Sequence, residues 1–153
     1  KIEKLNKSTF LVYTGIQRKS QLIEKKKMEN LRKHKLDNNL AKIYEITQKA
    51  FEEFTKKKFN LKKIGKLLTD QWNEKKSLAN NISNPTVEKI SKICMNNGAY
   101  GTKLVGSGGG GFVLVIFPSN KKKKLIESLK NFRIVNFRFE NTGSTIIYKS
   151  NEI

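Results

Sequence analysis

A run of glycines offers the clearest opportunity for chemistry in this chain. Residues 106–111 read Gly-Ser-Gly-Gly-Gly-Gly and hold five of the ten glycines in the 153-residue sequence. Glycine backbone can take positive φ angles and lets another molecule approach closely, and successive free N–H groups can form a concave site for an anion. Because each glycine costs backbone entropy on folding, we expect this run to serve a ligand or a close packing contact.

The run matches the pattern G-x-G-x-x-G, which several nucleotide-binding folds share. A dinucleotide-binding fingerprint requires a helix directly after the loop, whereas residues 112–117 form an apolar run that predicts a buried strand. A P-loop would end in Gly-Lys-Ser/Thr, and a protein kinase would need a downstream catalytic Asp loop and Asp-Phe-Gly; neither follows. What remains is a strand, a glycine loop and a strand. A hairpin loop without a ligand is the alternative, although a plain hairpin needs only one or two glycines.

The rest of the chain must supply the elements that position this loop. Apolar runs and alternation predict strands at 9–14, 102–105, 112–117, 133–140 and 144–149. Three- and four-residue spacing predicts helices over 36–54, 61–79, 85–97 and 121–132, with a weaker helical pattern at 20–33. Strands joined by hairpins indicate an α+β fold. We expect one domain, residues 1–153, with an antiparallel sheet of about four to five strands and helices packed on one face.

The net charge of +19 first suggests a nucleic-acid-binding protein. Only four of the 32 basic residues are arginine, the residue preferred for forked contacts with phosphates and bases. The lysines are spread over the whole chain and are not interleaved with exposed aromatic residues suited to base stacking. We therefore predict no nucleic-acid partner, and a basic α+β nucleic-acid-binding module stays an alternative that charge alone favours.

Composition also limits the cellular setting. No apolar run approaches the length of a membrane span, and no signal peptide opens the chain, so we predict no membrane partner. The single Cys94 excludes an internal disulfide, and its helical spacing with Val87 and Ile90 predicts a buried structural thiol. These features suit a reducing compartment, and we predict a cytoplasmic protein. No pattern of His, Cys and acidic residues indicates a metal site.

One charged residue falls on an apolar helix face. Apolar side chains recur at positions 61, 64, 68, 72 and 79, and Lys75 lies on the same face. A lysine in such a place either extends past the edge of the core to solvent or points into a polar cavity. The spacing alone leaves both alternatives open.

Four segments of the sequence, in one order, resemble the C-terminal half of the GHMP small-molecule kinases, the family named for galactokinase, homoserine, mevalonate and phosphomevalonate kinases. They read Leu-Val-Tyr-Thr-Gly-Ile-Gln-Arg at 11–18, Trp-Asn-Glu-Lys-Lys-Ser-Leu at 72–78, Ile-Ser-Asn-Pro at 82–85, and Gly-Ala-Tyr-Gly-Thr-Lys-Leu-Val before the glycine loop at 98–111. The resemblance covers almost the whole chain. It is strongest to the sugar-kinase branch that includes heptose 7-phosphate kinases, and bacterial fucokinases are near relatives of that branch.

The resemblance implies a phosphotransferase. ATP would donate its γ-phosphoryl group, with Mg²⁺ assisting, to a hydroxyl of a sugar or sugar phosphate, and in the heptose branch to O1 of D-glycero-D-manno-heptose 7-phosphate. The family's N-terminal half carries the nucleotide-phosphate loop, the sugar-orienting residues and the catalytic Asp, and this chain matches none of them. The chain would therefore supply one wall of the active cleft, with that N-terminal half as its partner, and would be inactive alone. A non-catalytic ligand-binding domain with the same fold is a further alternative.

The resemblance also assigns roles to particular residues. The glycine loop would border both nucleotide and substrate; its members are Gly106, Ser107, Gly108, Gly109, Gly110 and Gly111. Substrate binding falls to Lys75, Lys76, Arg18 and Thr14, and no catalytic residue or metal ligand is expected in this chain. Because the segment that holds Lys75 would lie beside the sugar, we predict that its ammonium reaches the same side of the domain as the glycine loop.

Overall fold

The computed structural model describes residues 1–17, 25, 28–33, 36–140 and 142–148. Its helices and strands follow in the order α1 (Ile2–Lys7), β1 (Thr9–Tyr13), α3 (Asp37–Thr55), α4 (Leu61–Lys76), α5 (Pro85–Asn96), β2 (Gly101–Leu104), β3 (Phe112–Ile116), the 3₁₀ helix η1 (Ser119–Lys121), α6 (Lys122–Ser128) and β4 (Arg133–Val135). Of the weak helical pattern at 20–33, residues 25 and 28–32 are helical, and most of the remainder lies outside the described residues.

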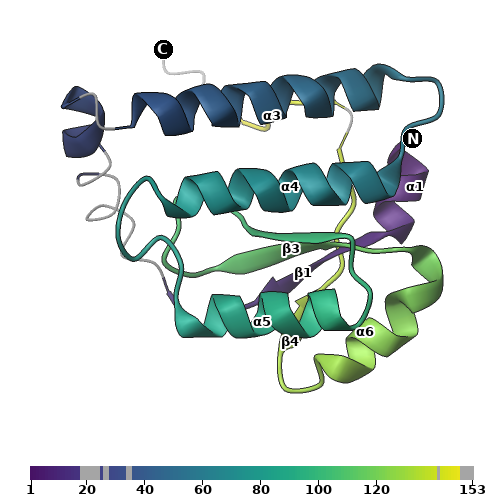
Figure 1. Cartoon of the computed structure of the whole chain (residues 1–153). Coiled ribbons are helices and arrows are strands. Elements are labelled where there is room, and N and C mark those ends of the chain that lie inside the picture. The colour runs from purple at the N-terminus through teal and green to yellow at the C-terminus, as the bar shows by residue number, and fades with distance from the viewer. Residues whose placement is uncertain (18–24, 26–27, 34–35, 141, 149–153) are drawn as a thin grey trace, which may run out of the picture.

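Four strands form one antiparallel sheet in the order β2-β3-β1-β4 (Figure 1). In the β2–β3 hairpin Gly101 lies opposite Ile116 and Leu104 lies opposite Val113. The Val105 N–H donates to the Phe112 carbonyl at 2.9 Å, so the glycine loop closes one end of this hairpin. The predicted strand, glycine loop and strand are confirmed, and the element after the loop is a strand.

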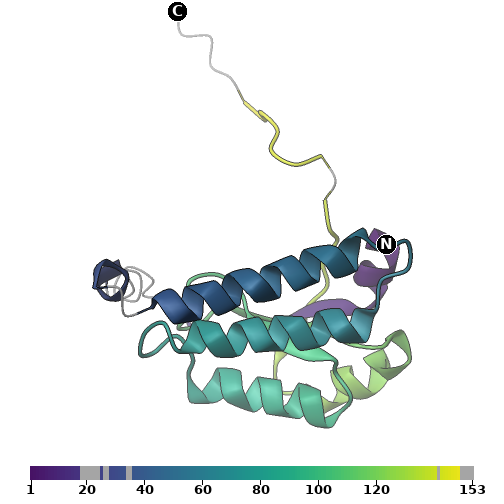
Figure 2. The ribbon, with the colours of Figure 1, turned by 45° about the horizontal axis from the view of Figure 1, so that its top comes forward.

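Helices pack on one face of the sheet. Figure 1 shows α4 and α5 side by side across the strands, and α3 lies on the outer side of α4 in both ribbon views (Figure 2). The central core is fully buried and includes Phe10, Val12, Trp72, Ile90, Leu104, Val113 and Phe117. Burial of such side chains is the main favourable term in folding. The predicted α+β fold with helices on one face is confirmed.

Two small residues let α4 approach the exposed edge of the sheet. A Cβ on Gly101 would overlap the Gly65 carbonyl, so helix and strand meet backbone to backbone. The Thr102 N–H then donates to Thr69 Oγ1 at 3.1 Å, which gives an edge-strand donor a partner on the helix. Unpaired edge groups invite pairing with other chains, so α4 protects this edge of β2.

The predicted helix start at Asn84-Pro85 is confirmed in detail. Asn84 caps α5, its side chain accepting from the Val87 N–H at 3.1 Å, and Pro85 occupies the first helical position. The same helix carries Cys94, which is fully buried as predicted. Burial raises the pKa of its thiol to about 12, so the thiolate that would act as a nucleophile is disfavoured.

Two predicted strands are wrong in extent. Of the segment 133–140 only Arg133–Val135 pairs with β1, as β4, and residues 136–140 have no regular structure. The described part of the predicted strand 144–149 is not a strand either; its Ile146, Ile147 and Tyr148 are exposed, and the segment extends away from the body (Figure 2). Alternation shows that a segment suits a sheet, but a strand also needs a neighbour, and 144–148 has none among the described residues.

The apolar face predicted for α3 is only partly buried. Leu36 is buried, and Ile43 and Phe54 pack against the cores, whereas Tyr44 and Phe51 are 66% and 65% exposed. The reason is position, because α3 lies outside α4 and contacts little else among the described residues. The short helix α1 was not predicted from the sequence.

Candidate functional site

The glycine loop takes a backbone path that other residues would find costly. Its Gly106, Gly108, Gly109 and Gly111 have φ angles of 87°, 119°, 76° and 96°. Side chains are strained in this region, which glycine enters without penalty. Gly110 has no such angle, but a Cβ there would lie 2.6 Å from the Ile16 carbonyl oxygen. Glycine is thus required for backbone angle at four positions and for close packing at a fifth.

The segment after β1 anchors one side of the loop. Thr14 is buried, and its Oγ1 donates to the Gly111 carbonyl at 3.0 Å and accepts from the Gly111 N–H at 3.1 Å. The Gly111 N–H also donates to the Ile16 carbonyl at 3.0 Å. Buried hydrogen bonds of this kind fix geometry because a lost partner leaves a desolvated polar group. The loop therefore cannot move freely relative to β1.

The approach to α5 anchors the other side. The Gly109 N–H donates to the Ile82 carbonyl at 2.9 Å, and the Asn84 side-chain amide donates to the Gly109 carbonyl at 3.1 Å. A Cβ on Gly108 would meet Ile82 at 3.1 Å. Asn84 therefore has two roles, since its other side-chain atom caps α5. The helix start and the glycine loop are held as one unit.

Several polar groups of the loop are left for a ligand. The Ser107 hydroxyl is buried and has no hydrogen-bond partner among the described residues. Within the same described part of the chain, the N–H groups of Ser107, Gly108 and Gly110 donate to no protein acceptor. A buried donor without a partner is costly, so such groups mark places where a bound molecule or water completes the site. The loop has donors suited to an oxygen-rich ligand.

Lys75 points to this loop, as predicted. Its ammonium donates to the Gly106 carbonyl, which lies 31 residues away in the sequence. The side chain is half-buried, so it neither lies in the core nor extends freely into solvent. It also lines a cavity of about 260 Å³ whose other walls are mostly apolar, among them Leu36, Leu40 and Leu78. A cation beside an apolar cavity is costly unless it is hydrogen-bonded or paired with an anion.

A second lysine joins Lys75 at the same cavity. Lys103 on β2 is half-buried, and its ammonium donates to the Gln71 side chain. Burial, and then the neighbouring positive charge of Lys75, lower the pKa of Lys103. An anion bound between them would offset both effects, because a nearby negative charge favours the charged form of lysine.

Sequence reasoning did not single out Lys103, Ile82 or Asn84 as site residues. Lys103 belongs to the Thr-Lys-Leu-Val segment directly before the loop, and its place on a strand that leads into the glycine run was the available signal. The contacts of Ile82 and Asn84 with the loop join positions 25 or more residues apart, and their one signal was that both residues lie in the Ile-Ser-Asn-Pro segment of the family resemblance.

The other predicted substrate residues are placed differently. Lys76 turns toward α5, where its ammonium lies 3.3 Å from Glu88 and 5.8 Å from the centre of the Trp72 ring system. Thr14 lies under the loop, its hydroxyl bonded to Gly111. Arg18 lies outside the described residues. The structure thus brings Lys75 and Thr14 to the loop and turns Lys76 to a neighbouring helix.

The described residues contain no group of three or more His, Cys, Asp or Glu side chains that could hold a metal ion. In the same part of the chain, no helix combines the length and apolar character needed to cross a bilayer.

Comparison with known proteins identifies the family of this fold. Residues 47–134, which include α4, α5, the β2–β3 hairpin and the glycine loop, match the family described as GHMP kinases C terminal. The chain belongs to the GHMP kinase C-terminal domain family. Members of this family are ATP-dependent kinases.

Individual GHMP kinases resemble the chain over different lengths. D-glycero-alpha-D-manno-heptose 7-phosphate kinase from Campylobacter jejuni is 30% identical over 141 residues, which cover 91% of this chain and 41% of that protein. Mevalonate kinase from Methanocaldococcus jannaschii is 39% identical over 80 residues, 51% of this chain and 25% of that protein. The crystal structure of the Methanococcus jannaschii mevalonate kinase superposes with a TM-score of 0.68 and 29% identity, over 91% of this chain and 42% of that one. The chain therefore spans less than half the length of these relatives.

Proposed function

We propose that residues 1–153 form the C-terminal domain of an ATP-dependent sugar kinase, and that its acceptor is O1 of D-glycero-D-manno-heptose 7-phosphate. The observation that carries this proposal is the similarity to a heptose 7-phosphate kinase along 91% of the chain. Two lysines beside the glycine loop fit an acceptor that already bears a phosphate. The same two lysines would have no charged partner on a neutral sugar.

In this proposal the domain forms one wall of the active cleft. An N-terminal half, as in the family, supplies the nucleotide-phosphate loop and the catalytic Asp, and it also holds most of the ATP and Mg²⁺. The 41% share of the heptose kinase that this chain covers supports such a division. We place the Mg²⁺ ligands in that N-terminal half and assign no metal-dependent step to residues 1–153.

The glycine loop contributes position and donors. Phosphoryl transfer needs little covalent chemistry from the protein, and most of the catalytic effect comes from alignment and charge stabilisation. A loop that is fixed on both sides, at Thr14 and at Ile82, can hold reacting groups without rearrangement. Ser107 and the free N–H groups next to it would then donate to oxygen atoms of the bound substrate or nucleotide.

Lys75 would bind the phosphate of the acceptor, with Lys103 beside it. In the structure the Lys75 ammonium donates to the Gly106 carbonyl and the Lys103 ammonium donates to the Gln71 side chain. Charge-assisted hydrogen bonds to an anion are stronger than those to a neutral carbonyl. Thr14 would act through the loop that it supports. Lys76 and Arg18 stay predictions as substrate-binding residues.

The test is an acceptor panel with the whole gene product that contains this chain. ATP-dependent phosphorylation of D-glycero-D-manno-heptose 7-phosphate, mevalonate, galactose and fucose is measured by ADP release. We expect the heptose phosphate to give the highest kcat/KM. Activity on mevalonate alone would overturn the proposed acceptor, and failure to transfer phosphate to any of the four would count against a sugar kinase.

A further inference from the structure

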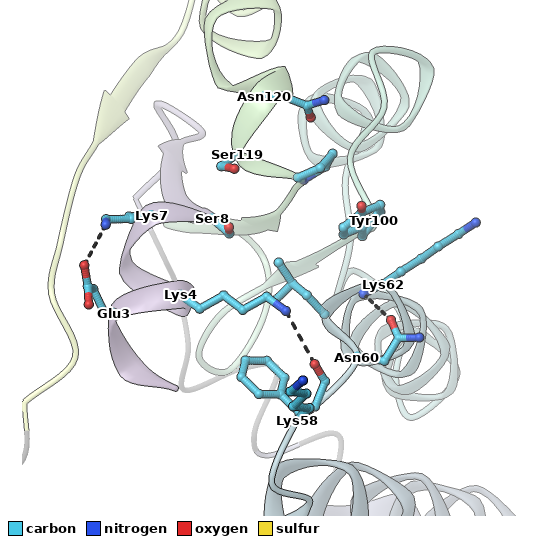
Figure 3. A pocket seen from close by; sticks show the side chains of 13 residues that line it. Glu3, Lys4, Lys7, Ser8, Lys58, Asn60, Lys62, Tyr100, Ser119 and Asn120 are labelled. Carbon is cyan, nitrogen blue, oxygen red and sulfur yellow. Dashed lines mark hydrogen bonds and ion pairs between the residues drawn. The ribbon is translucent and has the colours of Figure 1, made fainter.

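A second concave region lies at the end of the sheet opposite the glycine loop. The loop joins Leu104 to Phe112, whereas the other end of the same hairpin is where Gly101 pairs with Ile116. There a pocket of about 790 Å³ is formed by α1, the α3–α4 connection, Tyr100 and the segment from Pro118 to Asn120 (Figure 3). We call it the basic pocket; none of its lining residues takes part in the site described above.

Positive charge predominates in the basic pocket. Its lining includes Lys4, Lys7, Lys58 and Lys62, and its one acidic residue, Glu3, is paired with Lys7 at 2.6 Å. Lys4 lies 4.9 Å from the centre of the Phe59 ring and donates to the Phe59 carbonyl at 3.5 Å, which holds its ammonium at the wall (Figure 3). Like charges gathered around one cavity repel each other, and an anion placed among them removes that repulsion.

A hydroxyl on the pocket wall adds a donor that is not a lysine. Ser8 is 3% exposed and lines the pocket, yet its hydroxyl makes no hydrogen bond to any other described residue. Figure 3 shows it on the wall between Ser119 and Lys4. Because Ser8 lines the pocket and its hydroxyl is not among the fully buried side-chain atoms of the described residues, the hydroxyl can donate to a molecule bound there. The N-terminus of the 16-residue helix α4 opens into the same pocket at Asn60–Lys62 and adds the positive end of a helix dipole.

We propose that the basic pocket binds a small phosphorylated anion, at a site separate from the glycine loop. The pocket has the volume of a small-molecule site, and its lysines, hydroxyl and helix N-terminus together suit the several oxygens of a diphosphate group. Its aromatic residues argue against a single-stranded nucleic acid, because Phe59 is buried and takes no part in an exposed stacking surface.

The first experiment measures the binding of inorganic pyrophosphate by calorimetry at physiological salt, with the whole gene product that contains this chain and with ATP saturating its proposed nucleotide site. We expect saturable binding at one site. The double substitution Lys4→Gln/Lys58→Gln should weaken it at least about fivefold, the effect of losing two exposed charge contacts. A matched control is Lys89→Gln/Lys92→Gln on α5, which removes the same charge from exposed positions outside the pocket and should change affinity less than about twofold.

Ser8→Ala separates ligand binding from stability. Because the hydroxyl has no partner in the unliganded protein, its removal should leave the melting temperature unchanged or raised, while pyrophosphate affinity falls about 3- to 10-fold. A lower melting temperature with unchanged affinity would overturn the role of Ser8 as a ligand-binding group. The proposed anion site would be overturned if pyrophosphate binding did not reach saturation. It would also be overturned if the α5 control weakened binding as much as the pocket substitutions.

A third variant distinguishes anion binding in the basic pocket from anion binding at the glycine loop. Lys75→Met removes a cation at the glycine loop and should leave pyrophosphate affinity for the basic pocket unchanged. If Lys75→Met abolishes binding and Lys4→Gln/Lys58→Gln does not, the anion binds at the glycine loop and the proposal fails. A mixed-sequence oligonucleotide that binds more tightly than pyrophosphate, and loses affinity with the α5 control, would overturn it in favour of a nucleic-acid surface.

Discussion

The two ends of the β2–β3 hairpin are built in opposite ways. At one end the glycine loop is fixed by backbone hydrogen bonds, at Gly109 and Gly111, and by glycines that no other residue can replace without strain. At the other end the basic pocket is lined by exposed lysines on three separate segments. Backbone geometry is thus the main feature of the end with the glycine loop, and positive charge is the main feature of the end with the basic pocket. One short hairpin therefore places a site fixed by glycine geometry and a site lined by lysines at opposite ends of the same two strands.

The connection between α3 and α4, beside the basic pocket, is held by ion pairs and a hydrogen bond to one buried carboxylate. Glu53 on α3 is buried, and its carboxylate accepts from the Asn60 N–H at 2.7 Å while it pairs with Lys56 at 2.7 Å and with Lys63 at 3.2 Å. These contacts fix the connection that carries Lys58 to the pocket. The hydrogen bond from Lys56, and then that from the Asn60 backbone, lower the pKa of Glu53 to about 2.

The largest effect is expected from Gly110→Ala at the rigid end. The new Cβ would lie 2.6 Å from the Ile16 carbonyl oxygen, a backbone atom that can move only with the end of β1. We expect a loss of about 2–3 kcal/mol in the free energy of unfolding, the usual cost of forced overpacking. Urea denaturation measures it.

Gly143→Ala is the matched control for that substitution. Gly143 has a φ of 68° and open space around its missing Cβ, so alanine there meets only backbone strain. Because the segment beside Gly143 packs against nothing among the described residues, we expect little change in the free energy of unfolding. If Gly110→Ala proved no more destabilising than this control, the glycine loop would be adaptable and the contrast between the two ends would disappear.

The second prediction concerns Lys75→Met in the whole gene product, assayed for the proposed kinase activity. The substitution should raise the KM for the sugar phosphate about 10- to 150-fold, equivalent to about 1.5–3 kcal/mol for a charge-assisted hydrogen bond. A long apolar side chain suits the mostly apolar cavity beside Lys75, so the melting temperature should stay close to that of the parent. The KM for ATP should change little.

Lys89→Met on α5 is the control, since Lys89 is an exposed lysine away from the loop. It should leave both KM values unchanged. A Lys75→Met enzyme with an unchanged sugar KM and unchanged stability would show that Lys75 is a solvent-directed lysine, and it would be removed from the proposed site.

The smallest expected effect is on the pH dependence of protein stability, to which Glu53 contributes near the basic pocket. Its pKa is lowered on folding, so its contribution to stability is present above about pH 4.5 and is lost as the pH falls through about 2. Glu53→Gln should be less stable than the parent at pH 7, and the difference should shrink between pH 4.5 and pH 2. Melting temperatures across this range measure it. If the melting temperatures of the parent and Glu53→Gln differed by the same amount at every pH, the low pKa of Glu53 would not be the cause of the difference in stability.

Much of the rigid end was predictable because its signals are local. The apolar runs beside the glycines predicted β2 and β3, and Asn84-Pro85 predicted the start of α5, since a cap and its helix are neighbours in sequence. The predicted place of Lys75 also followed from helical spacing together with a family resemblance. The partners that fix the loop, such as Ile82, could not be predicted, because nothing in a sequence states which distant carbonyl accepts a given N–H.

The sequence predicted almost nothing about the basic pocket. The charge of its lysines could not be distinguished from the scattered lysines elsewhere in the chain. Glu53 lies between Phe51 and Phe54 on α3, and the residues that pair with its carboxylate, Asn60 and Lys63, come after the end of this helix. Residues 136–140 and 144–148 show the reverse error, since their strand-like pattern was clear but the described structure pairs neither with a neighbouring strand.

The central claim is that this chain supplies one wall of a kinase active site and lacks the catalytic half. The most direct measurement compares ATP-dependent phosphorylation of D-glycero-D-manno-heptose 7-phosphate by residues 1–153 alone and by the whole gene product, at equal concentration. The account predicts transfer by the whole protein and none above background by residues 1–153. Phosphorylation by the isolated 153 residues would contradict it, because the catalytic groups would then lie within this chain.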